Sequence, residues 1–398
     1  MRILLLTHRY PYPVNDGGSA AVVSMAESLV EQGAQVTMLA MSTAKHPAGS
    51  LENKHQQFPL LNIICVDVPA RITIAGAIRN LLFSSLPYHV VRYASAGYRK
   101  AIIRCLSEQI DIVQIESLYL LGYVPLIRRF SKAKIVFRPH NFESEIWMRL
   151  LANEQNTFKR AALDLLVKRL WRYEKRIMNT YDLLVPISSH DLRSMTEAGN
   201  IRPAVVIPYG ITCHRSPSDY IKNNLCFIGA LDWYPNQEGL LWFIEKVWPW
   251  VLDKFPDLLL HVAGRNCPLW LIQKLQGKGI VFYGQVDDGN EFINNFGIMI
   301  VPLLSGSGIR IRILDGLAAG KIIVTTPVGA EGLPVVHGKH LLIAADSDSF
   351  VTGLCNVLQN PQDCKSLSLN GRKLVMEQFE RKSLAAKLLN FYQTHLSD

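Results

Sequence analysis

The sequence contains no run of 18 uninterrupted apolar residues, so no segment is predicted to cross a bilayer as a helix. Its seven cysteines are scattered, odd in number and without a Cys-x-x-Cys pair. This pattern argues against a disulfide framework or a zinc site and indicates a reducing, cytoplasmic location. The opening residues, MRILLLTHRYPYP, have too short an apolar run and no small-residue cleavage site for a signal peptide, so we interpret them as a buried strand.

Acidic residues are in deficit, but only in the first half of the chain. Residues 1–210 carry 25 basic and 16 acidic side chains, whereas residues 211–398 carry 17 of each. The asymmetry indicates an anionic partner for the first half, such as a membrane surface, a phosphorylated lipid or nucleic acid. Solvated helix faces without a partner are an equally weighted alternative for any one cluster. No nucleic acid is expected, because the basic residues are not interleaved with aromatic residues of a recognised module.

Short apolar runs alternate with helical patterns along nearly the whole chain, which is typical of βαβ units. In the first half we predict helices at 19–32 and 157–179, and strands at 2–6, 35–40, 63–68, 112–115, 134–138, 183–187 and 205–207. A second alternation predicts strands at 225–228, 258–263, 280–283, 298–301, 322–325 and 341–343. The predicted fold class is therefore α/β, with two Rossmann-like, doubly wound parallel-sheet domains.

The connection 212–223, TCHRSPSDYIKN, is polar and lacks periodicity, so we place a hinge there. We expect an N-terminal domain at 1–210, joined by a C-terminal helix at 383–398, and a C-terminal domain at 211–382. Two such domains are expected to face each other across a cleft at the carboxyl ends of their strands, where ligands bind in open α/β sheets.

Glycines follow predicted strands in both halves. Gly17 and Gly18 open the helix after the first strand, where free backbone N–H groups can face an anion, although most glycine pairs are only tight turns. Gly229 ends the first strand of the second half in the same way.

Polar residues follow the strand at 134–138. His140, Asn141 and Glu143 can contact sugar hydroxyls or phosphate from this position. A structural histidine, with Glu143 capping the next helix, has equal weight as an explanation.

The segment PLLSGSGIRIRILDGLAAGK at 302–321 carries the densest polar chemistry. Its glycines free backbone N–H groups to face a diphosphate, and Arg310 and Arg312 can neutralise that charge. Asp315 can accept both hydroxyls of a ribose. Helix caps and surface arginines explain each feature singly, but not their coincidence at one sheet edge. The residues expected to line the diphosphate with their backbone are Gly306, Ser307, Gly308 and Ile309.

Together with GALDWYPNQEGLLWF at 229–243, these motifs resemble family 4 retaining glycosyltransferases of GT-B fold, of the bacterial group 1 type, over essentially the full length. The resemblance implies a UDP-, GDP- or similar sugar donor as co-substrate, no required metal or cofactor, and retention of anomeric configuration. It places Gly17 and Gly18 at the donor phosphate or sugar and His140 at the donor sugar. Base and ribose would lie near Gly264, Val286 and Asp315.

The chain departs from the family pattern at three points. The usual Glu-x7-Glu carboxylates fall on Ser307 and Asp315, and the latter can still hold a ribose. The Arg and Lys pair after the first strand of the second domain is missing, and we expect Arg310 and Arg312 to replace its charge. The Asn-Gly at the domain crossing is Tyr209-Gly210.

The expected activity is hexosyl transfer to a glycan or lipid-linked acceptor in cell-envelope polysaccharide biosynthesis, with His140, Arg310 and Arg312 as catalytic residues. Two segments of the acceptor domain, the basic helix 157–179 and the apolar stretch 72–86, can rest on an anionic inner-leaflet surface. Core-facing helices with solvated charges are the alternative for each. Other functional hypotheses are a sugar-nucleotide epimerase, a phosphorylase, and a degenerate GT-B partner protein.

Overall fold

The computed structural model describes residues 1–12, 14, 17–49, 58–154, 156–212, 224–306 and 310–396. The chain divides into two compact units, which are described separately below. Unit 1 comprises Met1–Gly210 and Arg381–Asp398, and unit 2 comprises Ile211–Glu380. The predicted hinge at 212–223 lies, apart from Thr212, outside the described residues.

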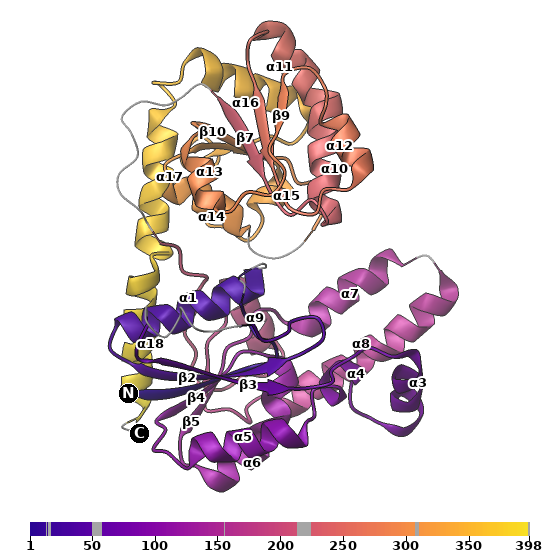
Figure 1. Ribbon diagram of the computed structural model, residues 1–398, viewed down its shortest axis with the longest axis vertical. Coiled ribbons are helices and arrows are strands. Elements are labelled where there is room, and N and C mark those ends of the chain that lie inside the picture. Colours follow the sequence, from indigo (N-terminus) through magenta and orange to yellow (C-terminus); the bar gives the residue numbers. More distant parts are fainter. Residues whose placement is uncertain are drawn as a thin grey trace. The chain divides into compact units, whose positions relative to one another are not determined.

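Unit 1 contains a six-stranded parallel sheet in the order β3-β2-β1-β4-β5-β6 (Figure 1). Its strands are β1 (Arg2–Thr7), β2 (Gln35–Ser42), β3 (Leu61–Asp67), β4 (Ile112–Ile115), β5 (Lys134–Phe137) and β6 (Leu183–Leu184). Its helices are α1 (Gly17–Glu31), α3 (Ile74–Phe83), α4 (Tyr88–Val91), α5 (Ala96–Leu106), η1 (Leu118–Tyr123), α6 (Val124–Phe130), α7 (Glu143–Asn153), α8 (Thr157–Ile177), α9 (Ser189–Glu197) and α18 (Arg381–Leu396).

The strand predicted at 205–207 is wrong, and the one at 183–187 is shorter than predicted. Beside β6, only Ala204 forms an isolated bridge, with Leu184. Pro186 follows β6 and has no N–H group to donate, so the ladder cannot extend through it. The chain at 205–207 still runs alongside, since Ile207 N donates to Pro186 O at 3.0 Å.

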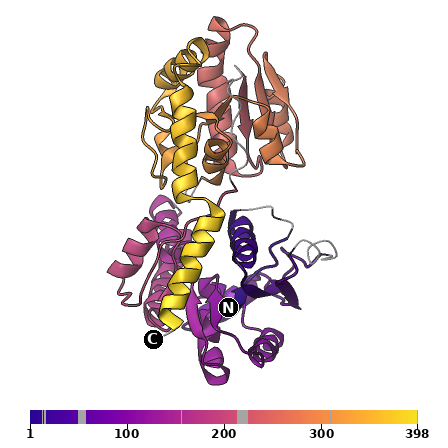
Figure 2. The same cartoon turned by 90° about the vertical axis from the view of Figure 1, so that its left-hand side faces the viewer.

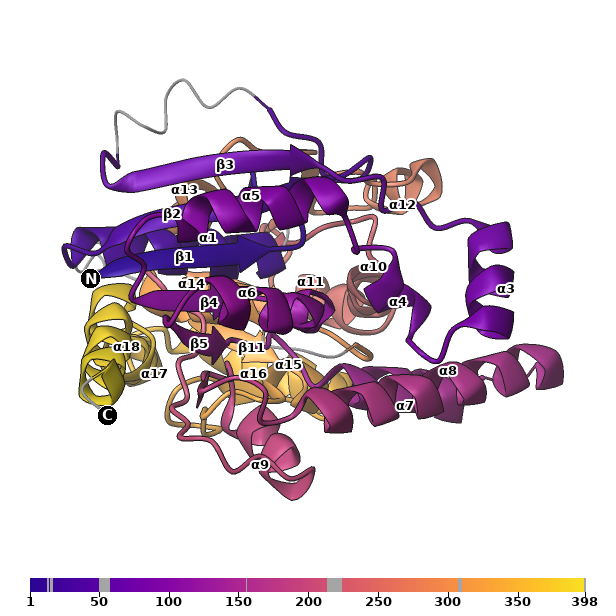
Figure 3. The same ribbon diagram turned by 90° about the horizontal axis from the view of Figure 1, so that it is seen from below.

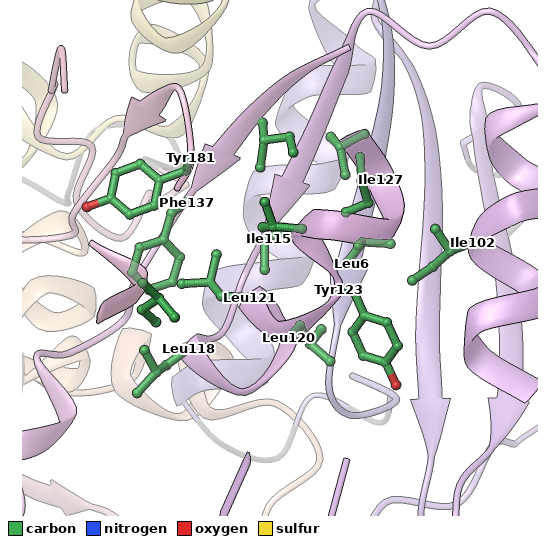
Figure 4. Close-up of a cluster of buried hydrophobic side chains, with 14 of the residues drawn as sticks. Leu6, Ile102, Ile115, Leu118, Leu120, Leu121, Tyr123, Ile127, Phe137 and Tyr181 are labelled. Atoms are coloured by element: carbon green, nitrogen blue, oxygen red, sulfur yellow. The ribbon is translucent and has the colours of Figure 1, made fainter. Parts of the chain in front are cut away.

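Side chains alternate between the two faces of the unit 1 sheet and build a core on each. Leu6 and Ile115 point to the face covered by α5 and α6, where they pack with Ile102 and Ile127 (Figure 4). Ile3 and Leu5 point to the opposite face. That second core is closed by α1 and by α18, which lie against each other (Figures 1 and 2). Helices therefore cover both faces, as a doubly wound sheet requires.

Unit 2 repeats this topology in the order β12-β11-β10-β7-β8-β9. Its strands are β7 (Leu225–Ile228), β8 (Leu260–Ala263), β9 (Ile280–Phe282), β10 (Ile298–Val301), β11 (Ile322–Thr325) and β12 (Leu342–Ile343). Its helices are α10 (Tyr234–Trp242), η2 (Phe243–Val247), α11 (Trp248–Lys254), α12 (Leu269–Lys274), α13 (Gly289–Asn294), α14 (Ile311–Ala318), α15 (Pro327–Ala330), α16 (Ser347–Gln359) and α17 (Lys365–Gln378).

Both sheets are parallel throughout, which confirms the predicted fold class of two doubly wound α/β domains. Chain order along each sheet reverses at one point, between β1 and β4 in unit 1 and between β7 and β10 in unit 2. Loops leaving the strands on either side of such a switch point diverge and leave room for a ligand. The residues that follow these four strands are therefore the first candidates for a site.

No helix in the described part of the chain is both long and apolar enough to span a membrane.

Candidate functional site

A buried charge cluster lies at the switch point of unit 1. Glu116 follows β4, while Arg138 and His140 follow β5. One oxygen of the Glu116 carboxylate, Oε2, lies 2.8 Å from Arg138 Nη1 and 2.8 Å from His140 Nε2. The side chains of Glu116 and Arg138 are 1% and 0% exposed, whereas His140 retains 18% exposure. His140 is thus the member of the cluster that a ligand can reach.

The protonation state of Glu116 determines the tautomer of His140. Burial raises the pKa of Glu116, but Arg138, His140 and Gln114 outweigh it and hold the pKa at about 2. An ionised carboxylate can only accept, so His140 Nε2 must carry the hydrogen that it donates. A neutral His140 then has its lone pair on Nδ1, which can accept a hydrogen bond from a hydroxyl group.

Two further residues extend this cluster through the sheet. Gln114 donates from Nε2 to Glu116, and its Oε1 accepts from the hydroxyl of Tyr392 on α18 at 2.6 Å. Tyr392 and Gln114 are both fully buried. The network therefore runs from the C-terminal helix to His140, and every carboxylate oxygen of Glu116 has a donor.

Aromatic rings pack beside the charge cluster. His8 follows β1, and its ring centroid lies 5.4 Å from that of Tyr93 and 5.2 Å from that of Tyr119. Tyr93 and Tyr119 are stacked at 5.3 Å, and His89 packs on Trp147 at 4.7 Å. Burial, assisted by Arg9 and His140, holds the pKa of His8 well below its usual value, so this ring is neutral.

Glu143 and Asn141, predicted to contact acceptor or sugar, lie at the start of α7. Burial raises the pKa of Glu143, while its hydrogen bond to Tyr119 opposes the rise. The helix cap is not made by Glu143. Glu174 of α8 accepts from the backbone N–H groups of Glu143 at 3.0 Å and Ser144 at 3.1 Å. The carboxylate of Glu143 is therefore not used to cap the helix. Asn141 is half-buried beside it.

Gly17 and Gly18 form the first turn of α1, directly after the loop that leaves β1. This turn contains no acidic side chain. Like His8 and Glu116, these glycines follow a strand of the unit 1 sheet, at the edge formed by its carboxyl ends.

In unit 2, the backbone turns after β7 and β8 touch. A Cβ on Gly264 would lie 2.3 Å from the carbonyl oxygen of Gly229, so only glycine fits. Two side-chain amides of α10 fix the turn after Gly229, because Asn236 donates to Ala230 O at 2.9 Å and Gln237 to Leu231 O at 2.7 Å. Val286 is half-buried in the neighbouring segment after β9.

The loop after β10 meets the same edge. Gly306 has a φ of +112°, and a Cβ there would lie 3.1 Å from the Trp233 indole. Ser305 before it donates to Glu238 of α10 at 2.6 Å. Ser307, Gly308 and Ile309, predicted to offer backbone amides, lie outside the described residues. The loop that is described thus ends with a strained position that only glycine adopts readily.

Arg312 and Asp315 pair directly on the first turn of α14. Arg312 Nη1 lies 3.2 Å from Asp315 Oδ2, with the side chains 48% and 12% exposed. Burial raises the pKa of Asp315 to about 6, Arg312 opposes the rise, and the neighbouring Asp288 adds to it. Asp315, the predicted ribose acceptor, is therefore partly protonated near pH 6. Arg312, one of the two predicted phosphate ligands, holds its carboxylate in place.

Arg310 occupies a different environment just before α14. Its side chain is buried, and its Nη2 would lie 3.5 Å from a Cβ on Gly306. Burial lowers the pKa of its guanidinium, and the charge of Glu331 opposes that. The two arginines thus stand at the same loop, one buried beside Gly306 and the other half-exposed beside Asp315.

Several residues of these clusters were missed at the sequence level. His8 and Glu116 directly follow strands at the switch point, which is a signal that could have identified them. Gln114 lies within a strand, and Glu174 and Tyr392 lie within helices. Their sequence positions carry no comparable signal, because long-range packing alone brings them to the site.

Solved structures with the same architecture cover both units. Sucrose-phosphate synthase from Thermosynechococcus elongatus is 15% identical, with 100% of each chain covered and a TM-score of 0.69. Anabaena HepE in complex with UDP is 13% identical, with 99% of this chain and 100% of that chain covered and a TM-score of 0.69. HepE is also solved with UDP-glucose, at a TM-score of 0.64. These likenesses define the fold as GT-B, the fold of a large class of glycosyltransferases.

Sequence comparison gives the family. A model described as "Glycosyltransferase Family 4" matches residues 15–215, and one described as "Glycosyl transferases group 1" matches residues 222–360. The chain belongs to glycosyltransferase family 4 and is a glycosyltransferase, as its motifs predict. An uncharacterized 44.6 kDa protein in the cps region of Klebsiella pneumoniae is 25% identical over an aligned length of 402 residues, gaps included, and the alignment covers 97% of this chain and 98% of that protein.

Proposed function

We propose that this glycosyltransferase moves a hexose from a nucleotide-diphosphate sugar to a glycan or lipid-linked acceptor, with retention of configuration. The observation that carries the proposal is the Arg312–Asp315 pair at the glycine-bearing loop after β10, with Arg310 beside it. HepE complexes with UDP and UDP-glucose support a uridine nucleotide as donor. The relative from a cps region supports a role in cell-envelope polysaccharide synthesis.

In this proposal unit 2 holds the donor. Asp315 accepts the ribose hydroxyls, and the close turns at Gly229 and Gly264, with Val286, form the surface for the base. Arg312 offers a half-exposed guanidinium to the diphosphate, and Arg310 adds a buried positive charge. The Gly306–Ile309 amides are proposed to complete the phosphate site.

Unit 1 is proposed to contact the donor sugar and the acceptor. The Nδ1 atom of His140 accepts from a sugar hydroxyl while Glu116 fixes the ring. Glu143 and Asn141 contact the acceptor or the sugar. As the glycosidic bond breaks, negative charge develops on the leaving phosphate oxygen, and the arginines stabilise it. That oxygen takes the proton of the attacking hydroxyl on the same face. No metal is required, because arginine supplies the positive charge.

Thermal unfolding with a panel of UDP-, GDP- and dTDP-sugars, in EDTA, tests the donor class. A nucleotide sugar present at about 100 times its Kd should raise the Tm of wild type by about 5–10 °C. Asp315→Asn should reduce the shift, since it removes a ribose acceptor. The absence of a shift with every nucleotide, or a shift that needs divalent metal, would contradict the proposal.

Donor affinity is expected to depend on the titration of Asp315. Only the ionised carboxylate accepts two ribose hydroxyls, and its pKa is about 6. Affinity should be constant above this pH and weaken by about tenfold per pH unit below it. Calorimetric titration with the nucleotide sugar measures this, because the diphosphate diester does not itself titrate there. In Asp315→Asn the affinity should be weaker and flat with pH, and an unchanged profile in that variant would reject the assignment.

A further inference from the structure

Large apolar side chains are exposed at both ends of α3. Ile72 before the helix is 73% exposed, and Leu82 and Phe83 in its last turn are 68% and 83% exposed. Side chains of this size are normally covered in a folded domain, and neighbouring exposed ones mark an interaction site. We call Leu82 and Phe83, at the carboxyl end of the helix, the apolar tip.

The exposed face of α8 is basic. Positions three or four apart on a helix share a face, and this face carries Lys168, Arg172, Lys175 and Arg176, all exposed. Asp164 pairs with Lys168 at 2.6 Å, and the other acidic residue of the helix, Glu174, is buried against α7. Trp171 is 41% exposed on this face, and its ring lies 4.3 Å from Lys175 Nζ. We call the four cations the basic face.

The apolar tip and the basic face are joined by one side chain. Arg169 of α8 donates from Nη2 to Leu81 O at 2.8 Å and from Nη1 to Asn80 O at 3.3 Å, which caps the carboxyl end of α3. The two helices extend on the same side of unit 1 (Figure 3). The exposed apolar residues and the cations therefore form parts of one surface of this unit.

We propose that this surface docks unit 1 on an anionic lipid bilayer. The chemistry favours lipid as the occupant, because flexible apolar side chains can enter the acyl boundary while cations and a tryptophan remain at the headgroups. The apolar side chains lie on α3 and the cations on the neighbouring α8, an arrangement that a fluid surface accommodates. The inference rests on the proposed function in one respect, since docking would hold unit 1 where a lipid-linked acceptor resides.

Vesicle flotation of the full-length protein tests the proposal. Wild type should float with phosphatidylcholine vesicles that contain phosphatidylglycerol, and high salt or pure phosphatidylcholine should weaken this strongly. Arg172→Gln/Lys175→Gln should lower the partition coefficient roughly thirtyfold, since each cation near an anionic surface contributes about a factor of five. Leu82→Ser/Phe83→Ser should lower it by at least about tenfold through lost apolar burial.

Matched control variants change the same chemistry elsewhere on unit 1. Lys100→Gln/Arg104→Gln removes two exposed cations of α5, and Ile201→Ser removes a side chain that is 82% exposed. Both controls should float like wild type. Equal loss in the controls, equal binding to neutral vesicles, or no flotation of wild type would overturn the docking surface.

A second measurement separates this inference from the proposed function. The Tm shift with the nucleotide sugar should be unchanged in all four variants, because none of these residues is among those proposed to bind the donor. Flotation without any nucleotide-induced shift would reject the proposed donor and leave the docking surface intact. A nucleotide-induced shift without flotation would reject only the docking surface.

Discussion

Replacing Arg138 with methionine is expected to lower the free energy of unfolding of unit 1 by about 3–5 kcal/mol, because it leaves the Glu116 carboxylate buried without its main counter-charge. The two side chains are 0% and 1% exposed, so water cannot take over the lost interaction. Hydrogen exchange of the β4 and β5 amides in the full-length protein reports this local free energy directly.

The pH dependence identifies the cause. In wild type the pKa of Glu116 is lowered to about 2, so its contribution to stability is present above the unfolded pKa and is lost as pH falls toward 2. In Arg138→Met burial prevails and raises this pKa. The stability deficit should then be largest at neutral pH and shrink on acidification, as Glu116 becomes neutral.

Two control variants bracket this result. Arg128→Met removes an exposed ion pair with Asp182, 2.7 Å long, and should cost no more than about 1 kcal/mol. Arg138→Met combined with Glu116→Gln removes both charges and should recover much of the loss. A deficit in Arg138→Met as small as that of Arg128→Met, or one that is unchanged by pH, would show that the pair is not electrostatically important.

Much of the fold was predictable because strands that are buried on both faces appear in the sequence as short apolar runs. Apolar runs such as 298–301 and 322–325 coincide with β10 and β11, since both faces of those strands are covered by helices. Edge elements were less predictable. The strand at 205–207 failed because Pro186 on the neighbouring segment cannot donate, a fact that emerges only when the pairing is known.

The candidate site also has a part that could be predicted from the sequence and a part that could not. Gly306, Arg310 and Asp315 were identifiable because phosphate and ribose recognition requires particular residue types in one loop and its helix. Their arrangement was only partly predictable. The i,i+3 spacing of Arg312 and Asp315 on one helix permits their ion pair, but nothing local indicates that Arg310 is buried. The support of His140 was hidden for a stronger reason. It depends on Gln114 and Tyr392, which are 278 residues apart in the chain.

Arg312→Ala is expected to lower kcat by about 10²–10³-fold while the protein stays folded, if the arginine stabilises charge on the leaving phosphate. Its side chain is 48% exposed, so truncation leaves no buried cavity, and Asp315, which loses its ion-pair partner, retains 12% exposure. Arg310 is a poorer choice for this test because it is buried and its loss would also disturb packing. Transfer and donor hydrolysis are measured with the nucleotide sugar that gives the largest Tm shift.

Arg312 should also affect binding through Asp315, which provides a second readout in the same variant. Because Arg312 opposes the rise in the pKa of Asp315, its removal should move that pKa above about 6. The pH below which donor affinity weakens should therefore be higher in Arg312→Ala than in wild type. The control variant Lys278→Ala removes an exposed cation elsewhere in unit 2 and should leave both kcat and the pH profile unchanged. Arg312→Lys retains the charge without the two-pronged guanidinium group, so its kcat should lie between those of Arg312→Ala and Lys278→Ala. Wild-type turnover in Arg312→Ala would remove this residue from the catalytic site, and a lowered kcat with an unmoved pH profile would leave it a phosphate ligand that acts independently of Asp315.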